Sequence, residues 1–195
     1  MKKTISTLFL SIVVFALHAQ GFLHPGLLHT KQSLERMKAY VASKEESAYA
    51  AFNSLTEDKR AQADYKMAGP YKIIARDGEH RRTKGGSEND FAAAYYNALM
   101  WHLTGNAPHA DKALEIIRAY SATLESVDGH DAPLCSLQGF LLVNACELMR
   151  DRLGDEGNEA AQKMLKRAFV PVLNKFEADS PYANGNWGAI VNKMR

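Results

Sequence analysis

The residues best suited to chemistry lie in the segment 180–189, "SPYANGNWGA". It places Asn184, Asn186 and Trp187 close together on a stretch rich in Pro, Gly and Asn. Asparagines favour tight turns and helix N-caps, and that role alone would explain both amides. A side-chain amide can also donate to a substrate carboxylate, while an indole ring stacks on or packs beneath a sugar. The segment therefore fits either a structural turn or a site for an acidic sugar.

The second candidate is a basic stretch, residues 66–86, "KMAGPYKIIARDGEHRRTKGG". Between Lys66 and Lys84 it holds six Lys or Arg residues against two acidic ones. Loops this long in a compact domain are often functional, and guanidinium groups match carboxylates with paired hydrogen bonds. Arg81 and Arg82 are therefore candidate binding residues for an anionic substrate. A solvated surface loop explains the same composition.

A histidine stands on a third candidate loop, "SVDGHDAPL", residues 126–134. Asp128, Gly129 and Asp131 favour a turn around His130. An imidazole in such a place titrates near neutral pH, which makes His130 a candidate substrate-binding residue. A capping or solvent-exposed histidine is the alternative. The same two aspartates would be the carboxylate pair that a glycoside hydrolase requires.

Other site chemistries are not indicated. The chain has no His-Glu-x-x-His and no paired Cys-x-x-Cys, and His24 and His29 in "HPGLLH" lack a third ligand nearby. Walker loops, dinucleotide glycine motifs and nucleophile elbows are missing as well, so we expect neither a metal ion nor a cofactor. Cys135 and Cys146 are 11 residues apart. On one helix that is about 16 Å, beyond the ~7 Å reach of a disulfide, so two thiols are expected.

The N-terminus predicts export. Two lysines precede an apolar run at residues 8–17, and Ala19 offers a small residue for cleavage. Residues 1–19 are therefore interpreted as a signal peptide, which would send the protein to the periplasm or outside the cell. Gln20 follows in place of Cys, which argues against a lipid anchor, and no later stretch is apolar enough to cross a membrane.

The remaining residues, 20–195, are long enough for one domain with a substantial core. The full chain has 24 basic and 22 acidic residues, and removal of Lys2 and Lys3 leaves 22 of each. A nucleic-acid binder needs a dominant positive field, so a net charge near zero argues against one.

Helical periodicity dominates this domain, and no alternating strand pattern stands out. Aromatic residues in such helices are usually core, and sugar stacking by Tyr96 or Trp101 is the less common alternative. A long irregular stretch is expected at residues 61–87. The expected helices span about residues 31–41, 46–55, 87–106 with its caps, 107–124, 133–153 and 158–177, and another starts near Trp187.

Capping and breaking residues predict the helix boundaries. Thr30 and Ser87 are the expected N-caps, and Gly105 is the expected end of the third helix. Gly154 and Pro171 are expected to end or break the helical pattern around them.

Neighbouring helices joined by short connections should be antiparallel. We therefore predict an all-α fold of stacked antiparallel helical hairpins. No repeat of the tetratricopeptide, HEAT or ankyrin type is evident. The chain reaches Arg195 inside a new helix and without a stop signal, which predicts the N-terminal part of a longer protein.

Four segments occur in an order that resembles a known family: "HPGLLHTKQSLERMKAYV", "NDFAAAYYNALMWHLTGN", "QGFLLVNACELMRDRLG" and "NGNWGA". Together they resemble the secreted alginate-lyase-like proteins of the Bacteroidetes type, which belong to the (α/α)-toroid polysaccharide lyases. The resemblance implies that residues 20–195 form part of an (α/α) toroid, an incomplete barrel. It also implies metal-independent β-elimination on an anionic polysaccharide such as alginate or a glucuronan.

The resemblance assigns roles by position. Asn186 matches the asparagine that precedes Trp in related toroid lyases and would neutralise the uronate carboxylate, with Asn184 as the fallback. Trp187 would shape a sugar subsite. The family's catalytic Tyr and His have no counterpart that can be assigned here, and we expect them beyond Arg195. Tyr182 is close in sequence but is not assigned as the base.

Two other classes of function remain open. A non-catalytic carbohydrate-binding helical module, or an inactive paralogue, would share the indole and the basic loop but lack the acid and base. A helical scaffold for protein partners would need an exposed apolar concave patch, which no sequence feature demands.

Overall fold

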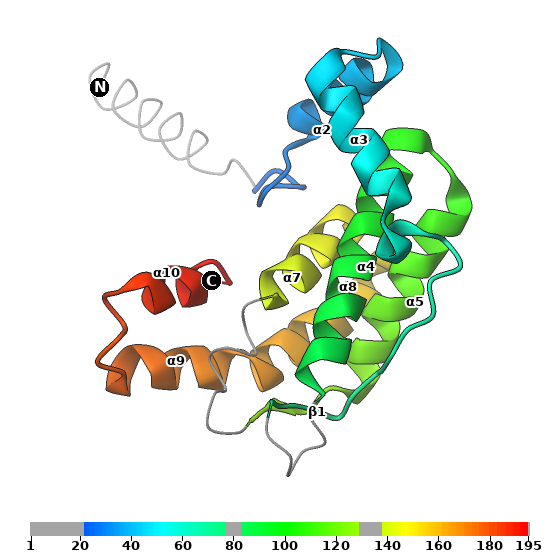
Figure 1. Ribbon diagram of the computed structural model, residues 1–195. Coiled ribbons are helices and arrows are strands. Elements are labelled where there is room, and N and C mark those ends of the chain that lie inside the picture. The colour runs from blue at the N-terminus through cyan, green and yellow to red at the C-terminus, as the bar shows by residue number, and fades with distance from the viewer. Residues whose placement is uncertain (1–21, 77–82, 129–137, 195) are drawn as a thin grey trace, which may run out of the picture.

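The computed structural model describes residues 22–76, 83–128 and 138–194. This part of the chain is mostly helical (Figure 1), which confirms the all-α prediction. The predicted signal peptide, residues 1–19, lies outside the described residues. The elements are α2 Lys31–Ala42, α3 Glu46–Glu57, a 3-10 turn η1 Lys59–Ala61, β1 Ile73–Ile74, α4 Lys84–Thr104, α5 Ala107–Thr123, β2 Ser126–Val127, α7 Gly139–Leu148, α8 Arg150–Ala168, α9 Val170–Asp179 and α10 Asn186–Asn192.

The central element is α4, which contacts α5, α7, α2 and η1. A helix that is apolar on nearly every side belongs inside a protein, and α4 has this character. Phe91 on α4 is fully buried, with its ring centroid 4.9 Å from that of Tyr120 and 6.2 Å from that of Phe169. Small side chains on the same helix allow neighbouring helices to approach closely: Ala92, Ala93, Ala94 and Ala98.

Several predicted boundaries are confirmed. The Thr30 side chain accepts a hydrogen bond from the Ser33 N–H at 3.1 Å and caps α2. Gly105 ends α4 in the left-handed region, with a φ of 73°. Gly154 has a φ of 68° and interrupts α8. Pro171 is the second residue of α9, which begins at Val170 directly after the break at Phe169. The helix expected to start near Trp187 is α10.

Two boundary predictions are wrong. Ser87 does not cap α4, because that helix begins earlier, at Lys84, and Ser87 donates to the Lys84 carbonyl from inside the first turn. The predicted helix 133–153 is divided, because α7 ends at Leu148 and α8 begins at Arg150. Residues 133–137 of that prediction lie outside the described part of the chain.

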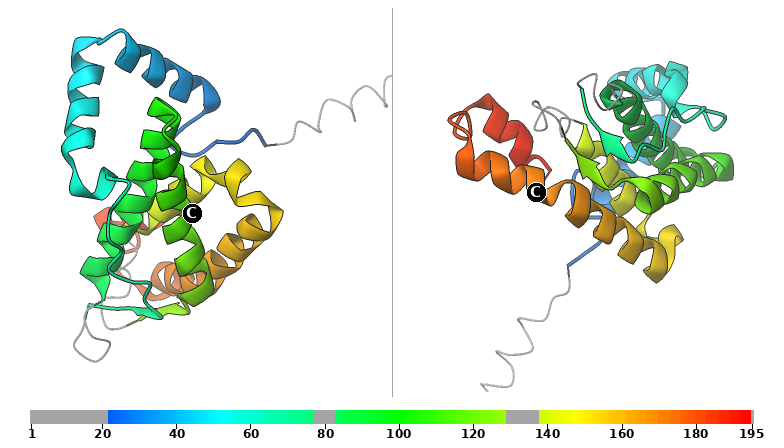
Figure 2. Two further views of the ribbon diagram at one scale, coloured as in Figure 1. Left: turned by 90° about the vertical axis from the view of Figure 1, so that its right-hand side faces the viewer. Right: turned by 90° about the horizontal axis from the view of Figure 1, so that it is seen from below.

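The sequence indicated no strands, but the structure contains two short ones. β1 and β2 pair in parallel, with Ile73 opposite Ser126 and Ile74 opposite Val127. They lie together at one end of the helices (Figure 2). The Thr83 hydroxyl donates to the Ile73 carbonyl at 2.6 Å and accepts from the Ala75 N–H at 2.9 Å. This engagement explains why the chain turns into α4 before Ser87.

The irregular segment between η1 and β1 is fastened to α4 by one carboxylate. Asp90 is fully buried and accepts from the Tyr65 hydroxyl, the Ala68 and Gly69 N–H groups and the Tyr120 hydroxyl, at 2.7–2.9 Å. Buried polar groups are tolerated only when they are hydrogen-bonded, and here each carboxylate oxygen has two donors. Burial and the bond to Asp90 raise the pKa of Tyr65 and of Tyr120. These two phenols are therefore structural donors.

Candidate functional site

Asn184 and Asn186 form an exposed edge beside α10, which we call the amide edge. The turn after α9 is closed by backbone bonds from Ala183 to Ser180 and from Gly185 to Tyr182. Asn184 lies in that turn and Asn186 is the first residue of α10; both are exposed. Neither side-chain amide has a hydrogen-bond partner among the described residues. Both can therefore donate to a ligand.

The structural role expected for these asparagines is only partly fulfilled. The N-cap of α10 is Gly185, with extended backbone, so Asn186 follows the cap and does not serve as it. Trp187 is half-buried and packs against the core cluster. The indole therefore packs against the protein and is not a ring that stands free in solvent.

The turn is held close to α10 by a glycine. A Cβ placed on Gly188 would lie 1.7 Å from the Ala183 carbonyl oxygen, a distance that no side chain permits. Gly188 is itself buried. Only glycine lets the backbone of the turn cross this first part of α10, so Gly188 fixes where the two asparagines stand.

The far end of α10 is anchored on α7. A Cβ on Gly139 would lie 2.5 Å from Met194 Sδ, and Lys193 Nζ lies 4.0 Å from the centre of the Phe140 ring. Val191 is 1% exposed and Met194 is 9% exposed, so apolar packing accompanies these contacts. The amide edge thus stands on a helix whose buried face is fixed to the core.

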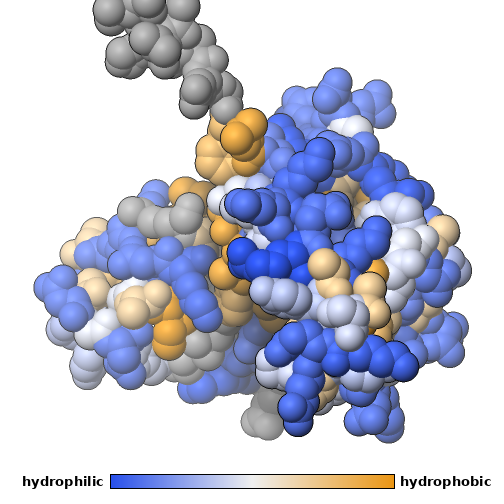
Figure 3. Space-filling view, turned by 90° about the horizontal axis from the view of Figure 1, so that it is seen from above, coloured by the Kyte–Doolittle hydropathy of each residue, from blue (hydrophilic) through white to orange (hydrophobic). Residues whose placement is uncertain are grey.

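A hollow separates the α9–α10 part from the rest of the molecule (Figure 3). Beside it lies the segment 22–30, which we call the strap. The strap carries the exposed apolar side chains Phe22, Leu23, Leu27 and Leu28. Apolar surface beside a few polar donors is typical of small-molecule sites, so the hollow is a candidate place for a ligand.

Both histidines of "HPGLLH" fasten the strap. His24 Nδ1 lies 2.5 Å from Glu147 Oε1, and the Gly26 N–H donates to the same oxygen at 3.0 Å. The Leu28 N–H donates to Asn144 Oδ1 at 3.0 Å. The sequence suggested these histidines only as metal ligands, because the strap's partners on α7 lie more than 115 residues away in the chain.

His29 forms the one Tyr–His pair found among the described residues. Its Nε2 lies 2.6 Å from the Tyr95 hydroxyl, and the two rings stack with centroids 5.8 Å apart. Burial and the neighbouring His102 lower the pKa of His29, while burial raises the pKa of Tyr95. A neutral imidazole and a protonated phenol therefore share a hydrogen bond, and this bond holds the strap against α4.

One helix supports both features. The amide edge rests on α7 through Gly139 and Phe140, and the strap rests on it through Asn144 and Glu147. At ~1.5 Å per residue, Gly139 is about 7 Å from Asn144 and about 12 Å from Glu147 along the axis. The position of α7 therefore sets the spacing between strap and amide edge.

The other predicted substrate-binding residues, Arg81, Arg82 and His130, lie outside the described residues. Their loops leave from neighbouring places, because one follows β1 and the other follows β2, and these strands pair. The Asp128 N–H also donates to the Ile74 carbonyl at 2.9 Å. Asp131, needed for the glycoside-hydrolase alternative, likewise lies outside the described part.

The aromatic residues of α4 are engaged by the protein. The Arg60 guanidinium lies 5.1 Å from the Tyr96 ring and that of Arg152 lies 4.8 Å from the Trp101 ring. His102 Nε2 bonds to the Leu148 carbonyl at 2.9 Å. These contacts favour a structural role for all three side chains.

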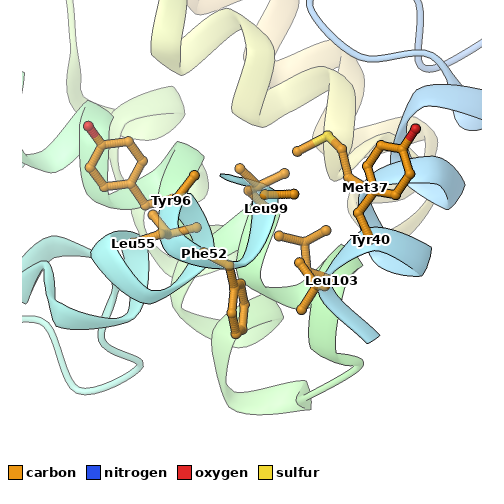
Figure 4. A pocket seen from close by; sticks show the side chains of 10 residues that line it. Met37, Tyr40, Phe52, Leu55, Tyr96, Leu99 and Leu103 are labelled. Carbon is orange, nitrogen blue, oxygen red and sulfur yellow. The ribbon is translucent and has the colours of Figure 1, made fainter. Parts of the chain in front are cut away.

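A pocket of about 260 Å³ lies between α2, α3 and α4 (Figure 4). Tyr40 and Tyr96 stand on its two sides, with their hydroxyls pointing away from the aliphatic side chains between them. The rest of the labelled lining is apolar: Met37, Phe52, Leu55, Leu99 and Leu103. It offers no charged group to a uronate carboxylate, so it is not the site for an acidic sugar.

No group of three or more His, Cys, Asp or Glu side chains that could hold a metal ion occurs in the described residues. Nor does any helix there combine the length and the apolar character that a membrane span needs.

Cys146 is a free thiol whose pKa burial raises to about 12, and Cys135 lies outside the described residues.

No protein-family model matches the chain, and no curated protein matches it. The four segments that resemble the toroid lyases nevertheless have definite places in the structure. They form the strap with α2, most of α4, α7 with the start of α8, and the end of the turn before α10 with the first four residues of that helix. The functional inference therefore rests on these segments and on the geometry of the amide edge.

Proposed function

We propose that this chain binds a uronan and belongs to a secreted or periplasmic polysaccharide lyase. Its substrate would be alginate or a glucuronan-like polymer. The observation that carries this proposal is the amide edge: two exposed amides without a partner among the described residues, beside a half-buried indole, on a helix anchored to α7.

The chemistry of β-elimination explains why such an amide is useful. A base removes the proton on C5 of a uronate, the electron pair forms the C4=C5 double bond, and the C4–O4 bond breaks as O4 takes up a proton. Negative charge develops on the carboxylate next to C5 during this step. Asn186 would donate to that carboxylate and stabilise the developing charge, with Asn184 as the neighbouring donor.

The packing of neighbouring helices supports the proposal of an (α/α) toroid. α4 and α5 are joined by a short connection and lie side by side, as one hairpin of an (α/α) toroid would (Figure 1). α8 packs on α5. We propose that these hairpins belong to an incomplete (α/α) barrel, as the resemblance implies.

A non-catalytic carbohydrate-binding module is the second candidate, and one observation favours it. Each histidine in the described residues already has a partner: His24 with Glu147, His29 with Tyr95, His102 with the Leu148 carbonyl and His109 with Asn97. None of them is a free base beside Asn186. Such a module would bind a uronan without cleaving it.

The test is the ultraviolet absorbance of alginate and glucuronan incubated with the protein, because the C4=C5 double bond conjugated to the carboxylate absorbs. We expect absorbance to grow with a protein that carries both this chain and the expected catalytic Tyr and His, and to be lost when that protein has Asn186→Ala. Retained binding of the polymer without any absorbance would select the binding module. Absence of both binding and absorbance would overturn both candidates.

A further inference from the structure

A second depression lies between α5 and α8, at the place where Gly154 interrupts α8. We call it the α5–α8 pocket; its volume is about 360 Å³. Small-molecule sites commonly have volumes of roughly 300–1,000 Å³, and this pocket falls within that range. Its polar residues are Arg118, Ser121 and Glu156, and its apolar wall includes Leu153 and Ala160.

Ser121 is the unusual residue of this pocket. It is 9% exposed, and its hydroxyl has no hydrogen-bond partner among the residues that the structure describes. Buried hydroxyl groups almost always have a partner, and a serine in a helix usually finds one in the preceding turn. The hydroxyl oxygen itself is buried, so it would reach a ligand in the pocket only through a change of the Ser121 rotamer.

Two charges of opposite sign accompany it. Arg118 and Glu156 are both exposed and line the same pocket from different helices. Within the described residues neither side chain forms an ion pair, with the other or elsewhere. The guanidinium can therefore bind a carboxylate, while the Glu156 carboxylate can accept from hydroxyl groups.

We propose that the α5–α8 pocket binds an acidic sugar, one uronate residue, at a site separate from the amide edge. The uronate carboxylate pairs with Arg118 and accepts from the Ser121 hydroxyl. Glu156 accepts from the sugar hydroxyls, and a C–H face of the ring rests on Leu153 and Ala160. This proposal stands whether or not the amide edge is catalytic, because it shares none of its residues.

The test uses the ¹⁵N-labelled full chain titrated with sodium D-glucuronate. We expect saturable shifts of the Ala122, Gly157 and Ala160 amide signals. Arg118→Gln should weaken the apparent affinity at these signals about tenfold or more, as expected for loss of a charge-assisted bond. Asn186→Ala should leave them unchanged, which separates this site from the proposed lyase site.

Three further measurements complete the test. Ser121→Ala should weaken glucuronate binding several-fold without lowering the unfolding temperature, because it removes a hydroxyl that had no partner. Ala160→Trp should block the pocket. Sodium acetate and D-glucose are the controls for charge alone and sugar alone. Equal shifts with either control, no saturable shift with glucuronate, or wild-type affinity in Arg118→Gln would overturn the proposal.

Discussion

The polar side chains of α4 and those beside α10 differ in their partners. Asp90 and Asn97 on α4 are fully buried, Asp90 with four donors and Asn97 with bonds to two carbonyls and to His109. Asn184 and Asn186 are exposed and lack any partner within the described chain. Amides and carboxylates of the first kind hold the fold together. Those of the second kind are available to a ligand.

This difference predicts that changes on α4 affect stability while changes at the amide edge affect binding. Asp90→Ala should have the largest effect. It leaves two hydroxyls and two N–H groups buried without an acceptor, and each orphaned donor costs about 1–3 kcal/mol. We expect the free energy of unfolding to fall by about 4 kcal/mol or more in urea titrations.

Two variants make that result interpretable. Asp90→Asn keeps one acceptor oxygen and should be less damaging, so it can be measured if Asp90→Ala does not fold. Asp111→Ala, on the exposed face of α5, should change the free energy of unfolding by about 0.5 kcal/mol or less. Equal effects at Asp90 and Asp111 would contradict the structural role of the buried network.

Gly188→Ala should have the next largest effect. Its Cβ would meet the Ala183 carbonyl, so the turn must move, at a cost of about 1–3 kcal/mol in stability. Uronan binding should weaken as well, because the asparagines move with the turn. Gly185→Ala is the matched control, since a Cβ there would have its nearest neighbour at an ordinary 3.5 Å. A tolerated Gly188→Ala would show that the turn is not fixed.

Asn186→Ala should alter binding alone. Loss of one amide donor to a carboxylate should raise the Kd for alginate oligosaccharides about tenfold, equivalent to about 1.4 kcal/mol. The unfolding midpoint should not change. Asn192→Ala, on the exposed last turn of the same helix, is the control in isothermal titration calorimetry. If both variants bind equally well, Asn186 does not contact the substrate.

The smallest effect concerns pH. Burial lowers the pKa of His29 and of His109, so below the ordinary histidine pKa of about 6.5 the unfolded chain binds more protons than the folded one. The free energy of unfolding should therefore fall as pH drops from 7.5 to 5.5. His109→Gln should reduce this pH dependence of the unfolding temperature. A steeper dependence in the variant would contradict the assignment.

Local signals in the sequence were enough to predict much of the fold. Thr30, Gly105 and Pro171 act within a few residues of themselves, and the structure places them as caps and breaks as expected. Ser87 was misjudged because Thr83 is recruited by β1, a contact that depends on strand pairing. Strands as short as β1 and β2, with two residues each, have no recognisable pattern in the sequence.

The candidate site was less predictable, because it too depends on contacts between residues that are distant in the sequence. The spacing of Asn184, Asn186 and Trp187 suggested a site, but their exposure depends on Gly188 and on the docking of Met194 against Gly139. The strap was missed because its partners on α7 are distant in sequence. The only local hint was the pair of histidines in "HPGLLH".

The most direct test of the central claim follows the side-chain NH₂ signals of Asn184 and Asn186 in ¹⁵N-labelled protein as alginate oligosaccharide is added. The account predicts that the Asn186 pair shifts and saturates together with the Trp187 indole N–H signal, while the Asn192 pair stays in place. Saturable binding that leaves the Asn186 pair unmoved would contradict it.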